Sequence, residues 1–371
     1  MNADVLIIGG GIHGCSAAYY LSKLGLKVTV LEKDWVSRHA SGVNAGGVRL
    51  LGRHPAEVAL SKASMEMWAN LDEELDADTG FRSRSHINIA IDEADIEIMN
   101  QRQTSMHSLG YFHEELIDQK ELRERLPAVA PHCIGGVVSE VDGYAIPYQS
   151  TNAFRHAAAR LGTQFIEGCA VHNVRKVGEN WLVESNQGQF EAEHLVNCAG
   201  AWADKIAIMI GDNAPLSFSA PMLAITSRMP QFISPVVGAV NGVLSFKQFE
   251  NGTVLIGGGL KGFADRDKNQ TRLDYKKMAA NAYHAADFFP IMKTASINRM
   301  WAGIEAYMPD KIPVIGKSMN ADKAYHAFGF SAHGFQMGPI IGKMMAELIV
   351  NGSPSLSLDA FNISRFETNK V

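Results

Sequence analysis

Several absences narrow what this chain can do. The 371 residues contain four cysteines, which lie too far apart to form a CxxC pair, and this argues against a zinc or iron–sulfur site within the chain. No apolar run reaches the ~18–20 residues that a membrane-spanning helix needs. Lys and Arg number 34 against 39 Asp and Glu, so the formal charge of −5 excludes a strongly basic nucleic-acid binder and a polybasic membrane patch.

The sequence also has no low-complexity linker, no internal repeat and no N-terminal targeting signal. Met1 to Asp4 leads directly into an apolar segment, without the charged region and cleavage site of a secretory signal. We therefore predict a cytoplasmic protein, in whose reducing compartment the cysteines are buried small hydrophobic residues. These cysteines are Cys15, Cys133, Cys169 and Cys198. At ~100–200 residues per domain, the length fits two domains or one large one.

The first 35 residues predict a strand, a glycine-rich turn, a helix and a second strand. Val5–Ile8 is an apolar run typical of a strand buried on both faces, and the segment 9–14 (GGGIHG) follows it. Residues 15–24 favour a helix that ends at Gly25, and residues 27–32 favour the second strand. This succession is the first crossover of a dinucleotide-binding fold.

Gly9, Gly11 and Gly14 satisfy the pattern G-x-G-x-x-G. Such glycines permit a tight turn, the approach of the backbone to a pyrophosphate, and close packing of helix on strand. Glu32 stands about 20 residues on, where a carboxylate binds a ribose hydroxyl and disfavours the 2′-phosphate of NADP. The bland alternative is a structural turn with a surface glutamate. A second glycine-rich segment, 44–47, suggests approach to another bulky part of a cofactor, or else a flexible surface loop.

The rest of the chain alternates between helical and strand-like segments. We expect helices at 56–78, 93–110, 118–126, 150–162 and from Pro339 to Asn351, and strands at 86–91, 164–167 and 193–200. Asn251-Gly252 signals a hairpin between two further strands. Nucleotide-type features at both ends, with hairpin strands between them, predict an α/β cofactor domain interrupted by an antiparallel substrate domain. The predicted cofactor domain comprises residues 1–80, 143–215 and 299–371, and the substrate or interface domain comprises residues 81–142 and 216–298.

Six segments together resemble the D-amino-acid oxidase, glycine oxidase and sarcosine oxidase family of flavoproteins. They are 5–32, 41–49 (SGVNAGGVR), 195–202 (LVNCAGAW), 301–303 (WAG), 309–316 (PDKIPVIG) and 329–339 (GFSAHGFQMGP). Within this family, the chain is most similar to β-type subunits of heteromeric amino- and imino-acid dehydrogenases, such as opine oxidases, hydrogen cyanide synthase, proline dehydrogenases and heterotetrameric sarcosine oxidase. The resemblance implies a Rossmann-like FAD-binding domain of the glutathione-reductase type, interrupted by an α+β substrate domain with a mostly antiparallel sheet.

The resemblance also implies a tightly bound FAD. Relatives with covalent flavin carry a cysteine near the position of Gly303, where this chain has none, so the FAD is expected to be non-covalent. Its expected binding residues are Gly9, Gly11, Ile12, His13, Gly14, Glu32, Lys33, Ser41, Asn44, Gly46, Gly47, Val171, Ala199, Gly200, Trp202, Gly303, His333, Gly334, Phe335, Gln336 and Met337.

The segment His333 to Met337 directly precedes the last predicted helix. A helix N-terminus presents free N–H groups and a partial positive charge. At the pyrimidine edge of a flavin, it would stabilise the negative charge that builds up as the ring accepts a hydride. The alternative is a capped helix without a ligand.

The chemistry that the resemblance implies is oxidation of the C–N bond of an amino acid or secondary amine. Hydride leaves the α-carbon for flavin N5, and the resulting imine is hydrolysed to an oxo acid. The chain then chiefly has to orient the α-carbon, and no metal site is expected. Glycine-oxidase-like members carry an arginine where this sequence has Glu305. A carboxylate favours a cationic group, which predicts a basic or opine-like substrate, unless Glu305 pairs with Arg299.

Arg49 becomes the expected partner of the substrate carboxylate. The expected catalytic residues are Arg49, His54, Glu305, Tyr307 and His333. Some relatives activate oxygen with a lysine near residues 253–256, where Leu255 stands here, and this favours electron transfer to a quinone or to a partner protein that carries a second flavin or an iron–sulfur cluster. The alternatives are a 2-hydroxy acid dehydrogenase and a non-catalytic FAD-binding subunit, while an NAD-dependent dehydrogenase would leave segment 329–339 unexplained.

Overall fold

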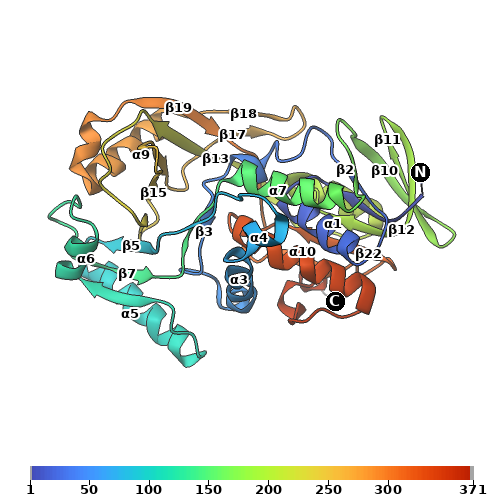
Figure 1. The fold of residues 1–371 in the computed structure, drawn as a ribbon, viewed down its shortest axis with the longest axis horizontal. Coiled ribbons are helices and arrows are strands. Elements are labelled where there is room, and N and C mark those ends of the chain that lie inside the picture. The colour runs from blue at the N-terminus through green and yellow to red at the C-terminus, as the bar shows by residue number, and fades with distance from the viewer. Residues whose placement is uncertain (1, 368–371) are drawn as a thin grey trace.

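The structure is a computed structural model that describes residues 2–367. The described chain contains a sheet of eight strands, which we call the first sheet, and a sheet of eleven strands, which we call the second sheet. Figure 1 shows both chain ends on the side of the first sheet, whereas segments from the middle of the sequence form the other side. The predicted fold class is confirmed, because a largely parallel α/β unit is interrupted by a mostly antiparallel one.

The first sheet is built around β1 (Asn2–Ile8), whose Val5, Leu6 and Ile7 are fully buried. β1 is parallel to β2 (Val28–Leu31) and to β12 (Gly188–Asn197). The other strands are β9 (Gln164–Ile166), β10 (Val171–Val177), β11 (Asn180–Ser185), β21 (Val314–Lys317) and β22 (Ala324–Phe328). Strands from the start, middle and end of the chain therefore share one sheet.

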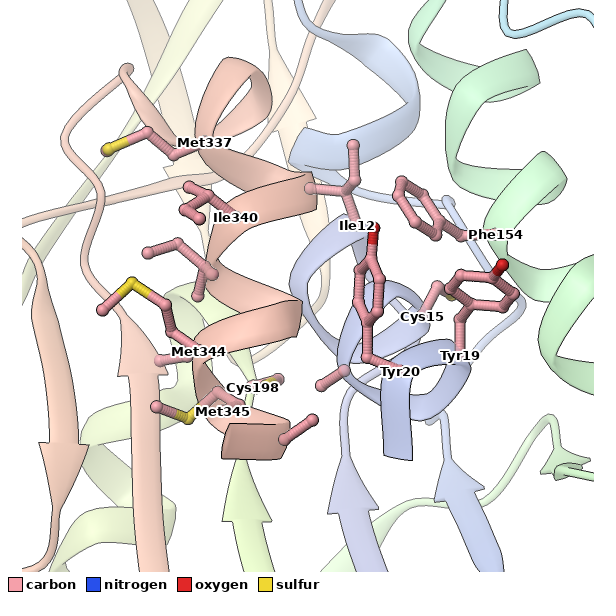
Figure 2. Packing of buried hydrophobic residues seen from close by; sticks show 14 of the residues in the cluster. Ile12, Cys15, Tyr19, Tyr20, Phe154, Cys198, Met337, Ile340, Met344 and Met345 are labelled. Carbon is pink, nitrogen blue, oxygen red and sulfur yellow. The ribbon is translucent and has the colours of Figure 1, made fainter. Parts of the chain in front are cut away.

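Helix α1 (Ile12–Lys23) packs between α7 (Pro147–Arg160) and α10 (Gly334–Asn351). Glycines permit this approach, because a Cβ on Gly342 would collide with Ser16 and one on Gly14 with the Gly9 carbonyl. Figure 2 shows the interlocking side chains, with Ile12, Cys15, Tyr19, Tyr20 and Phe154 on one side and Met337, Ile340, Met344 and Met345 on the other. The C-terminal helix is thus fixed rigidly against the helix that follows the glycine turn.

The second sheet centres on β13 (Ser217–Thr226), which pairs with four antiparallel strands. These are β16 (Val254–Gly257), β17 (Lys261–Asp265), β19 (Ile297–Ala302) and β20 (Glu305–Tyr307). The remaining strands are β5 (His86–Ala90), β6 (Glu115–Asp118), β7 (Gly135–Ser139), β14 (Val236–Ala239), β15 (Ser245–Gln248) and β18 (Gln270–Arg272). Three short strands, β3 (Gly47–Val48), β4 (Arg82–Ser83) and β8 (Gly143–Tyr144), form a separate small sheet.

Most predicted elements exist, with shifted bounds. The predicted hairpin is confirmed, because β15 and β16 are antiparallel and Gly252 has a φ of 86° in the turn. The predicted helix 56–78 is two helices, α3 (Pro55–Trp68) and α4 (Leu71–Leu75). The other helices are α2 (Ala40–Val43), α5 (Glu93–Ser108), α6 (Gln119–Arg125), α8 (Ala203–Ile210) and α9 (Tyr275–Phe288).

The last helix begins at Gly334, so the prediction that it begins at Pro339 is wrong. The prediction used the preference of proline for a first helical turn. Instead, Pro339 lies inside α10, and the residues before it are held by buried hydrogen bonds, such as those that the Gln336 carbonyl accepts from Ser64 and Trp68. Tertiary contacts therefore extend the helix past the point that local preference indicates.

The predicted domain boundaries remain a prediction. The boundary at residue 299 falls inside β19, and β20 also pairs with the second sheet. The four cysteines are free and buried, as expected. Within residues 2–367, no helix is both long enough and apolar enough to cross a bilayer.

Candidate cofactor and substrate site

A cavity of about 540 Å³ lies where segments of the first and second sheets meet. On the first-sheet side it is lined by the glycine turn, the loop 39–49, residues 169–171, residues 198–202 and residues 327–335. On the second-sheet side it is lined by parts of β13, β15, β16 and β20. His333, Gly334 and Phe335 therefore share one cavity with Gly9 and Gly11, although more than 300 residues separate them in sequence.

The glycine turn has the geometry of an anion cradle. Gly9 has a φ of 112°, and a Cβ there would collide with the Cys198 carbonyl. A Cβ on Gly11 would lie 2.9 Å from Ser41 Oγ, which accepts a hydrogen bond from the Ile12 N–H at 2.9 Å. The N-terminus of α1, with its unpaired N–H groups, thus opens onto the cavity where only glycine leaves room.

Glu32 lies just beyond β2 and braces the same turn. Its carboxylate accepts hydrogen bonds from the Gly10 N–H at 2.7 Å and the Asp34 N–H at 2.9 Å. Burial raises the pKa of Glu32, although these hydrogen bonds favour its charged form. Glu32 both lines the cavity and fixes the backbone of the glycine turn.

The structure brings most of the predicted site residues to the cavity. Those that line it are Gly9, Gly11, Ile12, His13, Glu32, Lys33, Ser41, Asn44, Gly46, Gly47, Arg49, Val171, Ala199, Gly200, Trp202, Gly303, Glu305, Tyr307, His333, Gly334 and Phe335. Gly14 lies behind the turn, where it permits the close packing of α1 on Gly9.

Three predicted site residues do not line the cavity. His54 is exposed, and its Nδ1 accepts a hydrogen bond from the Ala56 N–H at the start of α3, so its placement in the substrate site is wrong. Gln336 is fully buried and donates to the Ser61 carbonyl at 2.8 Å. Met337 is also fully buried and packs in the core (Figure 2). Both belong to the first turn of α10, whose side chains there face the interior.

A buried network behind His333 was not predicted. Glu57 is fully buried, and its Oε2 lies 3.2 Å from His333 Nδ1, while its Oε1 has no hydrogen-bond partner within the described chain. Arg53 is also buried and donates to the His333 carbonyl at 3.1 Å. Burial opposes ionisation of Glu57, but the hydrogen bond with His333 and the charge of Arg53 outweigh it, and its pKa lies below its ordinary value. The i, i+4 spacing of Arg53 and Glu57 was the available signal.

The network continues to the surface through Glu114 and Arg102. Arg102 makes two hydrogen bonds to the Glu114 carboxylate, at 2.6 and 2.7 Å, and one to the Arg53 carbonyl at 2.9 Å. Glu114 also accepts from the Gly52 N–H at 2.9 Å. Burial would raise the pKa of Glu114, but hydrogen bonds to His113 and Arg102 lower it to about 2. The loop that carries Arg53 is therefore held by a charged, partly buried clamp.

Three basic side chains line the cavity near the loop 44–49. Arg49 lies on this loop, whose following residues are held by the buried Asp142 carboxylate through the Leu50 and Leu51 N–H groups. Lys247 of β15 donates to the Ala45 carbonyl, and burial lowers its pKa to about 7. His86 has an unpartnered Nδ1 in the described chain, and burial together with Arg49 lowers its pKa to about 3.

Lys247 lies directly opposite Leu255 in the pairing of β15 with β16. The sequence has no lysine at 253–256, whereas the fold supplies a buried amine one strand away. The signal available was a single charged residue in an otherwise apolar strand.

The other end of the cavity carries a lone acidic group. Glu305 of β20 forms no ion pair within 4.0 Å among the described residues, and Arg299 is exposed and not paired with it. Tyr307 OH lies 3.5 Å from Glu305 Oε2, and Lys261 Nζ lies 4.2 Å from the centre of the Tyr307 ring. Burial raises the pKa of Glu305 to about 7. The alternative that Arg299 neutralises Glu305 is therefore excluded.

The family comparison agrees with this geometry. The family described as "FAD dependent oxidoreductase" (DAO) matches residues 4–348. The chain belongs to this family. The glycine cradle, the cavity reaching α10 and the carboxylate after β2 fit an elongated dinucleotide, and FAD is the cofactor of this DAO-family member.

Characterised relatives span nearly the whole chain. The beta subunit of sarcosine oxidase from Arthrobacter sp. is 27% identical and covers 99% of this chain and 92% of that protein. The opine oxidase component of Rhizobium meliloti that carries the letter B is 24% identical and covers 99% of each. Among solved structures, L-proline dehydrogenase of P. horikoshii has a TM-score of 0.91, 28% identity and 98% coverage of both chains. Glycine oxidase of Geobacillus kaustophilus, at 22% identity, has a TM-score of 0.92 over 99% of this chain and 100% of that chain, which shows a shared fold.

Proposed function

We propose that this DAO-family protein oxidises the C–N bond of an amino acid or a secondary amine. The observation that carries the proposal is the cavity, in which the glycine cradle and the N-terminus of α10 meet charged side chains of opposite sign, Arg49 and Glu305. The named substrates of the relatives, sarcosine, opines and proline, support an amine that bears a carboxylate. When bound, FAD supplies a hydride acceptor for the α-carbon of such a substrate.

The residues of this chain orient the substrate and stabilise charge. Arg49 is the proposed anchor of the substrate carboxylate, because a guanidinium offers several donors in a planar fork. The first N–H groups of α10 carry a partial positive charge beside the cavity, and His333 and Gly334 set their position. If the amine binds neutral, no strong general base is needed and orientation is the main contribution.

Glu305 supports a finer proposal, that the substrate carries a basic or opine-like group. A cavity carboxylate without a cationic partner in the described protein favours a cation supplied by the ligand. Because its pKa is about 7, Glu305 is largely ionised in mildly alkaline solution. Substrates with a guanidinium or second amine are therefore expected to bind better than neutral ones.

The remaining proposals concern the surroundings of the reaction. The sarcosine oxidase and opine oxidase relatives are each named as one component of a larger enzyme, which supports a heteromeric complex. Its other components would carry a second flavin or an iron–sulfur cluster and receive the electrons. Because Lys247 lies opposite Leu255, the lack of a lysine at 253–256 no longer supports this acceptor. We also propose non-covalent FAD and a cytoplasmic location. Denaturation with acid, followed by filtration, should release the yellow colour from the polypeptide.

The decisive test is anaerobic mixing of the purified holoenzyme with a panel of substrates. Amino acids, N-methyl amino acids, opines and 2-hydroxy acids are added separately, and loss of the visible flavin absorbance is followed. Bleaching by amines supports the proposal. Bleaching by hydroxy acids alone would instead establish a 2-hydroxy acid dehydrogenase, and no bleaching by any compound, with dithionite as the positive control, would indicate a non-catalytic FAD-binding subunit.

A further inference from the structure

The β17–β18 hairpin crosses from the second sheet to the first sheet near one end of the cavity. Its two strands pair from Phe263–Arg272 to Asp265–Gln270, and residues 266–269 form the tip. Figure 1 shows the hairpin extending from β13 toward β2. Since a two-stranded ribbon at a sheet edge is marginally stable by itself, contacts at the tip decide where it rests.

The tip is attached to residues that line the cavity. Asn269 accepts a hydrogen bond from Lys33 Nζ at 3.0 Å and donates to Asp34 Oδ2 at 2.9 Å. The Arg266 carbonyl accepts from Trp202 Nε1 at 3.1 Å. Lys33 Nζ lies 3.1 Å from the centre of the Trp202 ring, so one bound tip fixes both side chains.

Arg266 makes the second attachment. Its guanidinium donates to the Ala201 carbonyl at 2.8 Å and to Asp204 Oδ1 at 2.7 Å, and both side chains of this ion pair are less than one-fifth exposed. Asp267 and Lys205 also pair, at 2.6 Å, but Asp267 is 82% exposed, so this pair contributes little.

The hairpin touches the cavity wall from outside. Lys33, Ala201 and Trp202 line the cavity, whereas residues 261–272 do not. The same end of the cavity contains Glu32 and Val171, the residues proposed to hold the adenosine part of FAD. The hairpin tip therefore lies over the wall of this end rather than inside the binding site.

We propose that residues 266–269 form a strap, in which Arg266 and Asn269 are positioning residues that must detach before FAD enters or leaves. Detachment frees Lys33 and Trp202 together, because both are held by the same tip. The strap acts on the exchange of the cofactor and is independent of which amine the enzyme oxidises.

The test measures FAD exchange in the full-length protein without substrate. The variant is Arg266→Ala combined with Asn269→Gly, in which glycine tolerates the φ of 56° that Asn269 adopts. The matched control is Lys268→Ala, because Lys268 lies in the same tip, is 74% exposed and pairs only with Asp265 of the hairpin within the described chain. Release is followed as the rise of FAD fluorescence after dilution of holoenzyme, and binding as its quenching by apoprotein.

A strap predicts that release and binding both become roughly tenfold faster in the double variant, while the control keeps the parent rates. The dissociation constant then changes less than either rate. Faster release with unchanged binding would make Arg266 and Asn269 ordinary determinants of affinity and overturn the strap. Unchanged rates in the double variant would overturn it as well.

Discussion

The two walls of the cavity are built by different means. On the first-sheet side, the backbone forms the site, since Gly9 and Gly11 leave room and the N-terminus of α1 supplies donors. On the second-sheet side, side chains form it, since Lys247 and Glu305 project from strands of an antiparallel sheet. A backbone site tolerates almost no added atom, whereas a side-chain site can change its specificity one residue at a time. We expect mutations on the first wall to abolish cofactor binding and those on the second to alter substrate preference.

The largest expected effect is at Gly14. Gly14→Ala places a Cβ against the Gly9 carbonyl, which displaces the glycine turn and destabilises the protein by roughly 2–3 kcal/mol. We expect loss of bound FAD, measured as the ratio of visible to ultraviolet absorbance after purification. The control is Gly178→Ala, at a turn where an added Cβ meets no atom within 4 Å, and it should keep its FAD. Full FAD content in Gly14→Ala would contradict the backbone account of this wall.

Arg49→Ala is expected to change substrate binding without removing FAD. Loss of charged hydrogen bonds to the substrate carboxylate should raise KM roughly 10–100-fold, with intact flavin absorbance. Arg228→Ala, on an exposed residue, serves as the control. An unchanged KM would remove Arg49 as the anchor and leave Lys247 as the basic side chain to test.

Glu114 connects the two walls, and its effect appears as pH-dependent stability. Its folded pKa of about 2 lies below the ordinary value of 4.5, so its stabilisation is present above about pH 4.5 and is lost as the pH falls toward 2. Glu114→Gln should lower the free energy of unfolding by roughly 2–3 kcal/mol at pH 7 and flatten its decline in acid. Urea unfolding at several pH values measures this. Glu115→Gln, at the exposed neighbour, should match the parent at every pH.

The smallest expected effect is at Glu305. Glu305→Gln should reduce the preference for basic over neutral amines by about tenfold, measured as the ratio of kcat/KM values. In the parent, the pKa of about 7 means that this preference should rise as the pH increases through 7, because the carboxylate gains its charge. The variant should show no such rise. Arg299→Ala should behave like the parent, and a preference that is insensitive to Glu305 would show that this carboxylate does not meet the substrate.

The contrast between the two walls also explains which features could be predicted from sequence. The glycine turn and Glu32 were accessible because neighbours in sequence are neighbours in space there, over about 30 residues. Lys247 and the pair of Glu57 with His333 were not, because strand pairing and helix packing bring them to the cavity from distant segments. His54 illustrates the reverse error, since its adjacency to Arg53 in sequence placed it at the site while the start of α3 turns it toward solvent.

The position of α10 has a consequence for biosynthesis. This helix packs on α1 and presents His333 and Gly334 to the cavity, yet it comes more than 300 residues after α1 in the chain. A ribosome emits the N-terminal strand and glycine turn long before their partner exists, so the apolar face of α1 must wait until at least residue 351 has been translated. Flavin loading is therefore expected after the polypeptide has left the ribosome, and cellular chaperones have a defined surface to protect in the meantime.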